Sequence, residues 1–310
     1  MPRRRRLVAI ALVAVVAMLP VADGTRATVP PGTVLLARHA PILVLHPSER
    51  FRPVPVDGFL ADAELQRRTS AGWENVEGPL PVGGADLRLD QRLCRAIEGI
   101  AASPCYERAE AAHPSAPVVY GAVLRAKDRI DLQYWLWYPY NDYSPTVPAG
   151  DVWQVHEGDW ESVSVILDGK GRPLLVGLSK HCAGLRRAWN DVSRQGARPI
   201  VYVALGSHAN YFGVGTHRHS PSCWPRELRD VVRSLQLVDR TGAGRRLRPR
   251  LVSITSSRPP WMRFAGRWGE DGYVHFPNND PIAYQGSPVS PPFQDQWRYP
   301  VREELSWPRG

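Results

Sequence analysis

Short apolar runs, each ended by Gly, Pro, Asn or Asp, occupy most of the chain after residue 117 and constrain its fold more than any other feature. They lie at residues 118–124, 130–138, 160–167, 173–179, 200–205, 251–255 and 273–276. Runs of this length with turn residues between them predict β-strands, and several in succession predict two packed sheets. The 30 Pro and 26 Gly residues also disfavour long helices. The sequence therefore predicts an all-β protein, a β-sandwich with long loops.

The N-terminal part of the chain is more permissive for helices. Residues 40–47 are typical of a short buried strand closed by a turn, whereas residues 59–68 and 87–102 have helical spacing and predict a few short helices. Residues 227–237 fit a helix and a strand equally well. Because no internal repeat or linker divides the sequence, we expect a single β-sandwich domain over residues 28–310.

Residues 1–27 have the pattern of a secretory signal peptide. Four arginines at positions 3–6 precede an apolar run at residues 7–22, which is short for a membrane span of about 20 residues. The arginines fit both the Sec and the twin-arginine export routes, so the route stays open, and an uncleaved anchor is the alternative. We expect cleavage after Ala27 and a secreted or extracytoplasmic protein.

The basic charge of the chain does not point to nucleic acid. The formal net charge is +9, but residues 1–27 hold five Arg and one Asp, so their removal leaves +5 on residues 28–310. The one compact basic run, residues 245–250, is typical of a solvated loop or strand edge. Without a basic surface interleaved with aromatic residues, we exclude a nucleic-acid partner.

The cysteines predict two disulfide bonds, because an even number is expected to pair in an exported chain. Their proximity in the sequence favours Cys94–Cys105, which leaves Cys182–Cys223 as the second bond. The alternative is a zinc site whose ligands would be His181, Cys182, His217, His219 and Cys223. We favour the disulfides, since no CxxC pair is present and oxidised cysteines do not bind zinc.

An acidic cluster at residues 156–161 is the chemically most informative feature of the sequence. With a period of two, Asp159 and Glu161 share one strand face with three apolar residues, at positions 163, 165 and 167. Buried carboxylates must be protonated, paired or neutralised by a cation. His156 and Asp142 can add further ligands, and this donor set favours Mg²⁺, Ca²⁺ or Mn²⁺ over Zn²⁺. The alternative is a solvated acidic turn.

Three further side chains can serve the same site as outer groups, additional ligands or general bases: Glu157, His181 and His208. His181 and His208 each follow an apolar run, so both can lie at one rim of the sandwich. For each histidine alone, a hydrogen-bonded structural role is the alternative. Ser207 next to His208 does not indicate a serine hydrolase, because neighbouring strand residues point to opposite faces and no nucleophile elbow is present.

An aromatic cluster fills residues 134–143, with two Trp and four Tyr in ten residues. Such a cluster can form a sugar-stacking or membrane-interface surface. The favoured interpretation places one face of this strand in the core and the other at its rim.

Three segments in order, residues 156–161, 202–211 and 266–269, give the chain a family resemblance. They read His-Glu-Gly-Asp-Trp-Glu, Tyr-Val-Ala-Leu-Gly-Ser-His-Ala-Asn-Tyr and Gly-Arg-Trp-Gly. This combination resembles the vacuolar protein sorting-associated protein 62 family, over about residues 120–276. Because members of that family are mostly uncharacterised, the resemblance implies little about chemistry.

A second, more distant resemblance is to secreted necrosis-inducing (necrosis- and ethylene-inducing peptide-like) proteins. Their heptapeptide reads Gly-His-Arg-His-Asp-Trp-Glu and follows a Trp-Tyr-x-Pro-Lys-Asp stretch, which residues 137–142 resemble. In that family a β-sandwich holds a divalent cation, and the resemblance assigns its ligands here to Asp142, His156, Asp159 and Glu161. Glu157 and Gly158 replace the family's Arg-His pair, which weakens the transfer of toxicity more than that of the cation site.

Three functions are compatible with this sequence. The first is a secreted protein that uses the cation to recognise a glycan or a lipid headgroup at a membrane surface, with a membrane-active or cytolytic role. The second is a metal-dependent hydrolase of an ester, phosphoester or glycoside. The third is a structural cation site in an envelope-associated scaffold. We favour the first, without turnover, and the sequence leaves the oligomeric state open.

Overall fold

The computed structural model describes residues 31–94, 99–148, 150–224 and 226–300. The predicted signal peptide and its cleavage site therefore lie outside the described residues. In the described part of the chain, no helix has the length and apolar character needed to cross a membrane.

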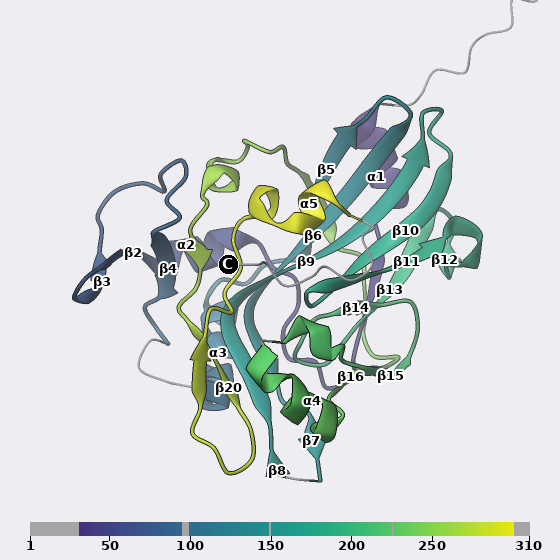
Figure 1. Cartoon of the computed structure of the whole chain (residues 1–310). Helices are drawn as coiled ribbons and strands as arrows, with labels where there is room; N and C mark the ends of the chain where they lie inside the picture. The colour runs from purple at the N-terminus through teal and green to yellow at the C-terminus, as the bar shows by residue number, and fades with distance from the viewer. Residues whose placement is uncertain (1–30, 95–98, 149, 225, 301–310) are drawn as a thin grey trace, which may run out of the picture.

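The larger of the two main sheets has eight strands and forms the centre of the molecule (Figure 1). Its strands are β5 (Val118–Arg125), β6 (Arg129–Tyr143), β9 (Trp153–Asp168), β10 (Pro173–Lys180), β11 (Ala183–Ala188), β18 (Arg250–Ser253), β20 (Gly272–His275) and β21 (Ile282–Tyr284). The order is β11–β10–β9–β6–β5–β18, with β20 paired to β9 and β21 to β20. The long strands β6 and β9 pair antiparallel from Arg129 opposite Asp168 to Tyr143 opposite Gln154.

The second main sheet has five strands in the order β12–β13–β1–β17, with β14 paired to β13. They are β1 (Ile42–Leu45), β12 (Arg194–Gln195), β13 (Arg198–Val203), β14 (Asn210–Tyr211) and β17 (Arg246–Leu247). Apolar side chains of β1 and β13 pack with those of β6, β9 and β10 in one buried cluster. Two sheets packed face to face around a shared core confirm the predicted β-sandwich.

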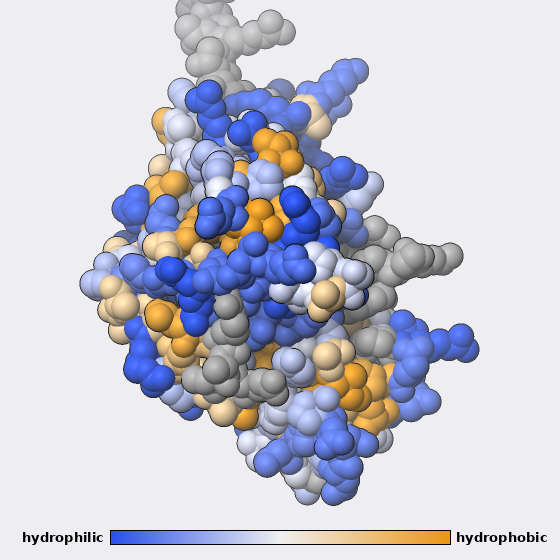
Figure 2. Space-filling view, turned by 90° about the vertical axis from the view of Figure 1, so that its left-hand side faces the viewer, coloured by the Kyte–Doolittle hydropathy of each residue, from blue (hydrophilic) through white to orange (hydrophobic). Residues whose placement is uncertain are grey.

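The opposite face of the central sheet is also covered. A four-stranded sheet, β19–β4–β2–β3, lies on this side together with three helices. Its strands are β2 (Ala63–Thr69), β3 (Gly72–Asn75), β4 (Leu87–Gln91) and β19 (Arg267–Trp268). A second core here contains Trp135, Trp137, Trp160, Trp261 and Trp268. Figure 2 shows the molecule from this side, where small hydrophobic areas alternate with hydrophilic side chains.

The helices of the described residues are short, as the Pro and Gly content predicts. The α-helices are α1 (Gly32–His39), α2 (Val56–Asp62), α3 (Ser103–Ala112), α4 (Arg229–Leu235) and α5 (Asp295–Arg298). The 3₁₀ helices are η1 (Gly99–Ala102), η2 (Trp189–Asp191), η3 (Pro221–Cys223), η4 (Arg226–Leu228), η5 (Pro260–Arg263) and η6 (Pro291–Phe293). Two small hairpins complete the fold: β7 (Thr146–Val147) with β8 (Gly150–Asp151), and β15 (Gly215–Arg218) with β16 (Val238–Thr241).

Two helix predictions were wrong in part; of the second, residues 87–102, positions 95–98 lie outside the described residues and positions 99–102 form η1. Of residues 59–68, the first four belong to α2 and the rest to strand β2. Residues 87–91 form strand β4, in which Leu87 and Leu89 alternate with polar residues and face the tryptophan-rich core. A period of two over five residues is a weak local signal, and pairing with β2 and β19 decides the outcome. The undecided segment 227–237 contains η4 and α4.

The aromatic cluster of β6 is core on both faces of the strand. Tyr134 and Tyr138 face the sandwich core and Trp135 and Trp137 face the second core, and all four side chains are fully buried. The expected rim face is therefore wrong, because the small sheet and its helices cover it. These aromatic residues do not form a sugar-stacking surface.

Candidate functional site

The residues of the acidic cluster lie on β9, where Gly158 interrupts the regular strand. Asp159 lies opposite Tyr138 and Glu161 opposite Leu136, so both carboxylates head the face that carries Val163. Gly158 has a φ of +62°, a left-handed conformation that glycine adopts readily. With this irregular backbone, residue 156 and the two acids all line one polar cavity of about 240 Å³.

His156 is half-buried, and a backbone carbonyl sets its tautomer. Its Nδ1 lies 2.8 Å from the carbonyl oxygen of Gly158, to which it donates, so Nε2 carries the free lone pair. Burial lowers the pKa of the imidazole. A neutral imidazole with one nitrogen held by a carbonyl is the form in which histidine binds metal ions.

Asp159 has a charged neighbour within the protein. His208 Nδ1 lies 3.0 Å from Asp159 Oδ2, and His208 Nε2 lies 3.6 Å from Glu49 Oε1. Burial alone would lower the pKa of His208, but the two carboxylates outweigh it and raise the pKa to about 10. The ring also stacks on Tyr138 at a centroid distance of 3.9 Å. His208 is therefore an imidazolium between two acids.

Glu161 has neutral partners. Its carboxylate accepts hydrogen bonds from the hydroxyl of Ser179 and from the Asn210 amide, the latter at 3.3 Å. Burial, followed by the charge of Asp159, raises the pKa of Glu161 well above its ordinary value. A buried carboxylate in this position holds either a proton or a cation.

Asp142 and Glu157 point to other surroundings. Asp142 lies 3.9 Å from Arg50 Nη1, and burial together with the charge of Glu49 raises its pKa to about 6. Of residues 137–142, Asn141 is among the described residues that line the cavity, whereas Asp142 is not. Glu157 accepts hydrogen bonds from the backbone amides of Gln91 and Glu270, at 2.7 and 2.9 Å.

A second cluster adjoins the cavity through His181. His181 Nε2 lies 2.7 Å from Asp239 Oδ2, and His219 Nε2 lies 3.1 Å from Asp239 Oδ1. Asp239 is fully buried; burial raises its pKa, but the two imidazoles outweigh burial and hold the pKa well below its ordinary value. Among the described residues, these three form the group of ligand side chains whose atoms all lie within 4.8 Å of one another.

The sequence pointed to His219 in the Cys/His zinc alternative and to His181 both there and as an outer group of the cation site, and it missed Asp239. The structure contains the disulfides Cys94–Cys105 and Cys182–Cys223, so the two cysteines of that alternative are not available as ligands. The second disulfide, however, brings its neighbours His181 and His219 together. The predicted disulfide was thus a sequence signal that could have brought these two histidines together.

The turn at residues 204–209 holds groups from both clusters. It joins β13 to β14 and is closed by a hydrogen bond from Ala204 N to Ala209 O. Ser207 donates to Asp239 Oδ1 at 2.6 Å, while His208 contacts Asp159. Both His181 and His208 adopt left-handed backbone conformations, with φ of 50° and 53°. Strained backbone of this kind is enriched at functional sites.

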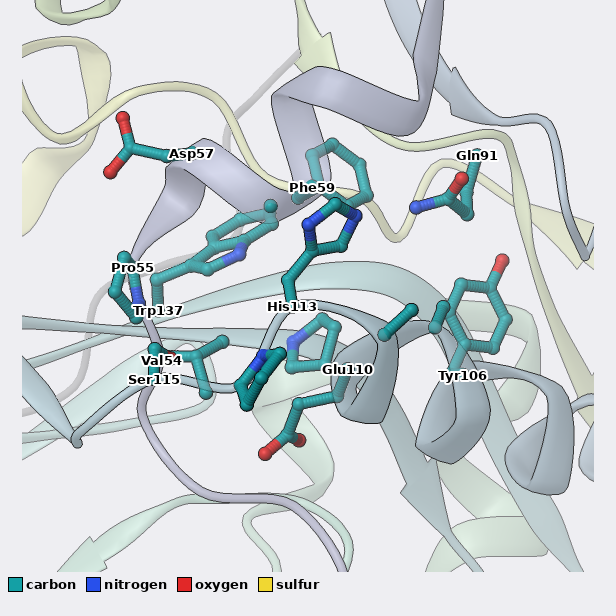
Figure 3. Close-up of a pocket in the computed structure, with 15 residues that line it drawn as sticks. Val54, Pro55, Asp57, Phe59, Gln91, Tyr106, Glu110, His113, Ser115 and Trp137 are labelled. Carbon is teal, nitrogen blue, oxygen red and sulfur yellow. The ribbon is translucent and has the colours of Figure 1, made fainter.

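A larger cavity of about 450 Å³ lies elsewhere, between α2, α3 and β6 (Figure 3). Phe59, Trp137 and Tyr106 give it mostly apolar walls, and His113 reaches over it to bond Asp62 at 2.6 Å. The predicted cation ligands are not among the described residues that line it.

The fold and the clusters together define a class of protein: a β-sandwich with buried carboxylate and imidazole groups at the ends of its central strands. No family model matches the chain. It is 27% identical over 212 residues to TDA6 of Saccharomyces cerevisiae, described as a vacuolar protein sorting-associated protein, covering 58% of this chain and 44% of the relative. It is also 27% identical over 177 residues to vacuolar protein sorting-associated protein 62 of the same yeast, covering 50% and 38%.

The predicted resemblance to the vacuolar protein sorting-associated protein 62 family is thus confirmed, and the chain spans less than half the length of these curated relatives. Solved structures found similar come from the second family that the motif indicates. They include NLPPya in complex with glucosamine, at 15% identity, a TM-score of 0.34 and 72% of both chains. Another is Necrosis and Ethylene inducing Protein 2 from the causal agent of cocoa's Witches Broom disease, at 17% identity, a TM-score of 0.31 and 60% of this chain and 69% of that one.

Proposed function

We propose that this protein is secreted and binds a divalent cation through His156, Asp159 and Glu161, with Asp142 left outside the ligand set, and that the bound cation recognises a polar ligand. The observation that carries the proposal is the environment of Glu161. Its carboxylate is buried, lies beside a second acid and has neutral hydrogen-bond partners. A divalent cation would supply the charge that these neutral groups cannot.

The chemistry of these three side chains, rather than their present spacing, fits such an ion. Two carboxylates and one neutral imidazole suit Mg²⁺, Ca²⁺ or Mn²⁺, which prefer oxygen ligands. The hydrogen bond between His156 Nδ1 and the Gly158 carbonyl leaves Nε2 as the ligand atom. The Asn210 amide and the Ser179 hydroxyl orient Glu161 from behind.

The cavity wall favours a glycan over a lipid headgroup. Five residues with side-chain amides line the same cavity as the carboxylates: Asn141, Gln154, Gln285, Gln294 and Gln296. Amide groups donate and accept at once, which matches sugar hydroxyls, and Tyr284 adds an aromatic ring beside them. A phosphate headgroup would instead call for basic side chains. We therefore assign a hydroxyl-rich sugar as the ligand class.

Elemental analysis and calorimetric titration of the exported protein test the cation. Wild type should bind one equivalent of Ca²⁺ or Mn²⁺, and the Asp159→Asn, Glu161→Gln double variant should bind none. Asp168→Asn is the matched control, because Asp168 lies on the same strand but pairs with Arg172 outside the cavity. Equal metal content in wild type and the double variant would overturn the proposal.

Glycan-array and liposome binding, each with and without chelator, then separate the uses of the cation. If the cation recognises a glycan, chelator should abolish glycan binding. Any binding to liposomes should then be the same with and without chelator. A structural cation site predicts that chelation lowers the melting temperature while no ligand binds. A hydrolase predicts turnover of chromogenic esters, phosphoesters or glycosides that stops in the double variant.

A further inference from the structure

We infer that the protein has a second metal site, formed by His181, His219 and Asp239, and that this site takes a borderline transition-metal ion such as Zn²⁺. The three ligands come from separate segments. His181 follows β10, His219 follows β15, and Asp239 lies within β16. The inference is independent of the cation proposed above, since it uses none of the same ligands.

The distances are close to those of a tetrahedral site. Ligands about 2.0–2.1 Å from a tetrahedral zinc ion lie about 3.3 Å from one another. Here the two imidazole nitrogens lie 2.7 and 3.1 Å from the oxygens of Asp239, and all three ligand atoms fall within 4.8 Å of one another. A small outward shift of the side chains would admit the ion.

The orientation of His219 supports the same conclusion. Its side chain is 3% exposed, and Nε2 is 3.1 Å from Asp239 Oδ1 yet forms no hydrogen bond of acceptable geometry. In a tetrahedral site the direction from a ligand to the metal departs from the direction to the next ligand by about 35°. A nitrogen that lies close to the carboxylate but does not point at it is therefore placed as a metal ligand would be.

The groups behind Asp239 complete the site. Ser207 donates to Oδ1 at 2.6 Å and Tyr211 donates to Oδ2 at 2.5 Å, so each oxygen accepts one hydroxyl and keeps a lone pair toward the histidines. Hydrogen-bonded carboxylates of this kind are the usual outer support of metal ligands. The Cys182–Cys223 disulfide lies next to His181 in the chain and fixes its segment to the one that follows His219.

Two imidazoles and one carboxylate select zinc-like ions over Ca²⁺ and Mg²⁺, which prefer sites in which oxygen ligands predominate. Three protein ligands also leave a fourth position for water or a ligand, as in catalytic zinc sites. His181 is 19% exposed at its side chain and lines the 240 Å³ cavity. The open position would therefore face the same cavity as Asp159 and Glu161.

Titration of the full exported protein with Zn²⁺, and with Co²⁺ as a spectroscopic probe, tests the site. We expect one Zn²⁺ equivalent, a rise in the melting temperature and the visible absorption of tetrahedral Co²⁺. His219→Gln and Asp239→Asn should each weaken Zn²⁺ binding by more than about 100-fold, since even outer-shell changes cost about 10–100-fold. His217→Gln is the matched control: this histidine lies on β15 but bonds Thr241 at 2.9 Å, so zinc binding should be unchanged.

The outcomes separate this inference from the proposed function. Glu161→Gln should lose Ca²⁺ or Mn²⁺ binding and keep the Co²⁺ absorption band, whereas His219→Gln should do the reverse. The wild-type Co²⁺ spectrum tests the site even if a variant does not fold. Octahedral Co²⁺ absorption in wild type, no Zn²⁺ binding in the micromolar range, or equal loss in His217→Gln and His219→Gln would each overturn the inference.

Discussion

Replacing Gly158 by alanine tests the backbone geometry that brings His156 and Asp159 to one cavity. Gly158 has a φ of +62°, and a Cβ added there would lie 2.1 Å from the carbonyl oxygen of Trp268 and 2.4 Å from the Trp137 ring. Both neighbours are fully buried, so neither can move away without disturbing the tryptophan-rich core. The strand must therefore shift, and the ligands on either side of Gly158 shift with it.

The expected loss of stability has two parts. A left-handed alanine costs about 1–2 kcal/mol, and forcing a methyl group into a packed core costs about 1–3 kcal/mol more. Gly158→Ala should thus lower the free energy of unfolding by about 2–5 kcal/mol. Gly196→Ala isolates the first part, because Gly196 has the same φ of +62° with nothing within 4 Å of the added Cβ. This control should lose about 1–2 kcal/mol.

Equilibrium urea denaturation with the disulfides intact, followed by tryptophan fluorescence, measures both variants. A titration with Mn²⁺ on folded Gly158→Ala should also show weaker binding than wild type, while Gly196→Ala should bind as wild type does. If the two variants lost equal stability, the close approach of Gly158 to Trp268 would be refuted, and with it the geometric basis of the cation site.

Two further predictions concern the supports of the second cluster. Removing the Cys182–Cys223 disulfide by double serine substitution should lower the free energy of unfolding by about 4 kcal/mol, against about 3 kcal/mol for Cys94–Cys105. The difference arises because the sequence separations are 41 and 11 residues. Thermal unfolding of both variants checks this order, and a larger loss at the shorter loop would contradict it. Ser207→Ala should lower the free energy of unfolding by about 1–3 kcal/mol and weaken Zn²⁺ binding by about 10-fold, because the buried Asp239 loses a hydrogen-bond donor. Unchanged zinc affinity in calorimetry would show that the Ser207 hydroxyl does not support Asp239.

The central sheet was predictable because its strands repeat one simple pattern. Residues 130–138, 160–167 and 173–179 all lie in β6, β9 and β10, where long apolar faces must be buried. The second covering layer was not predictable, because its strand β4 is five residues long and takes its structure from its neighbours. Because this layer was not predicted, one face of β6 was expected at the rim, whereas both faces are buried in a core.

The site residues differ in the same way: some are close together in the sequence, and others are brought together only by the fold. His156, Asp159 and Glu161 fall within six residues, so a period of two and one glycine suffice to place them together. Asp239 lies 58 residues from His181, and Glu49 lies 157 residues from the Gly206 amide that it accepts from. The sequence near Asp239 or Glu49 does not indicate these contacts, because they form only when distant segments of the chain pack together.

Ser207 and His208 lie in the turn between β13 and β14 rather than in a strand. The strand alternation on which their exclusion as a catalytic pair was based does not apply here, because His208 has a left-handed φ of 53°; the two side chains nevertheless bond different partners. Ser207 bonds Asp239 and His208 bonds Asp159, so one tight turn supports the carboxylates of both clusters. The conformation of this turn, rather than strand alternation, thus explains how two ligand groups from distant strands come to adjoin one cavity.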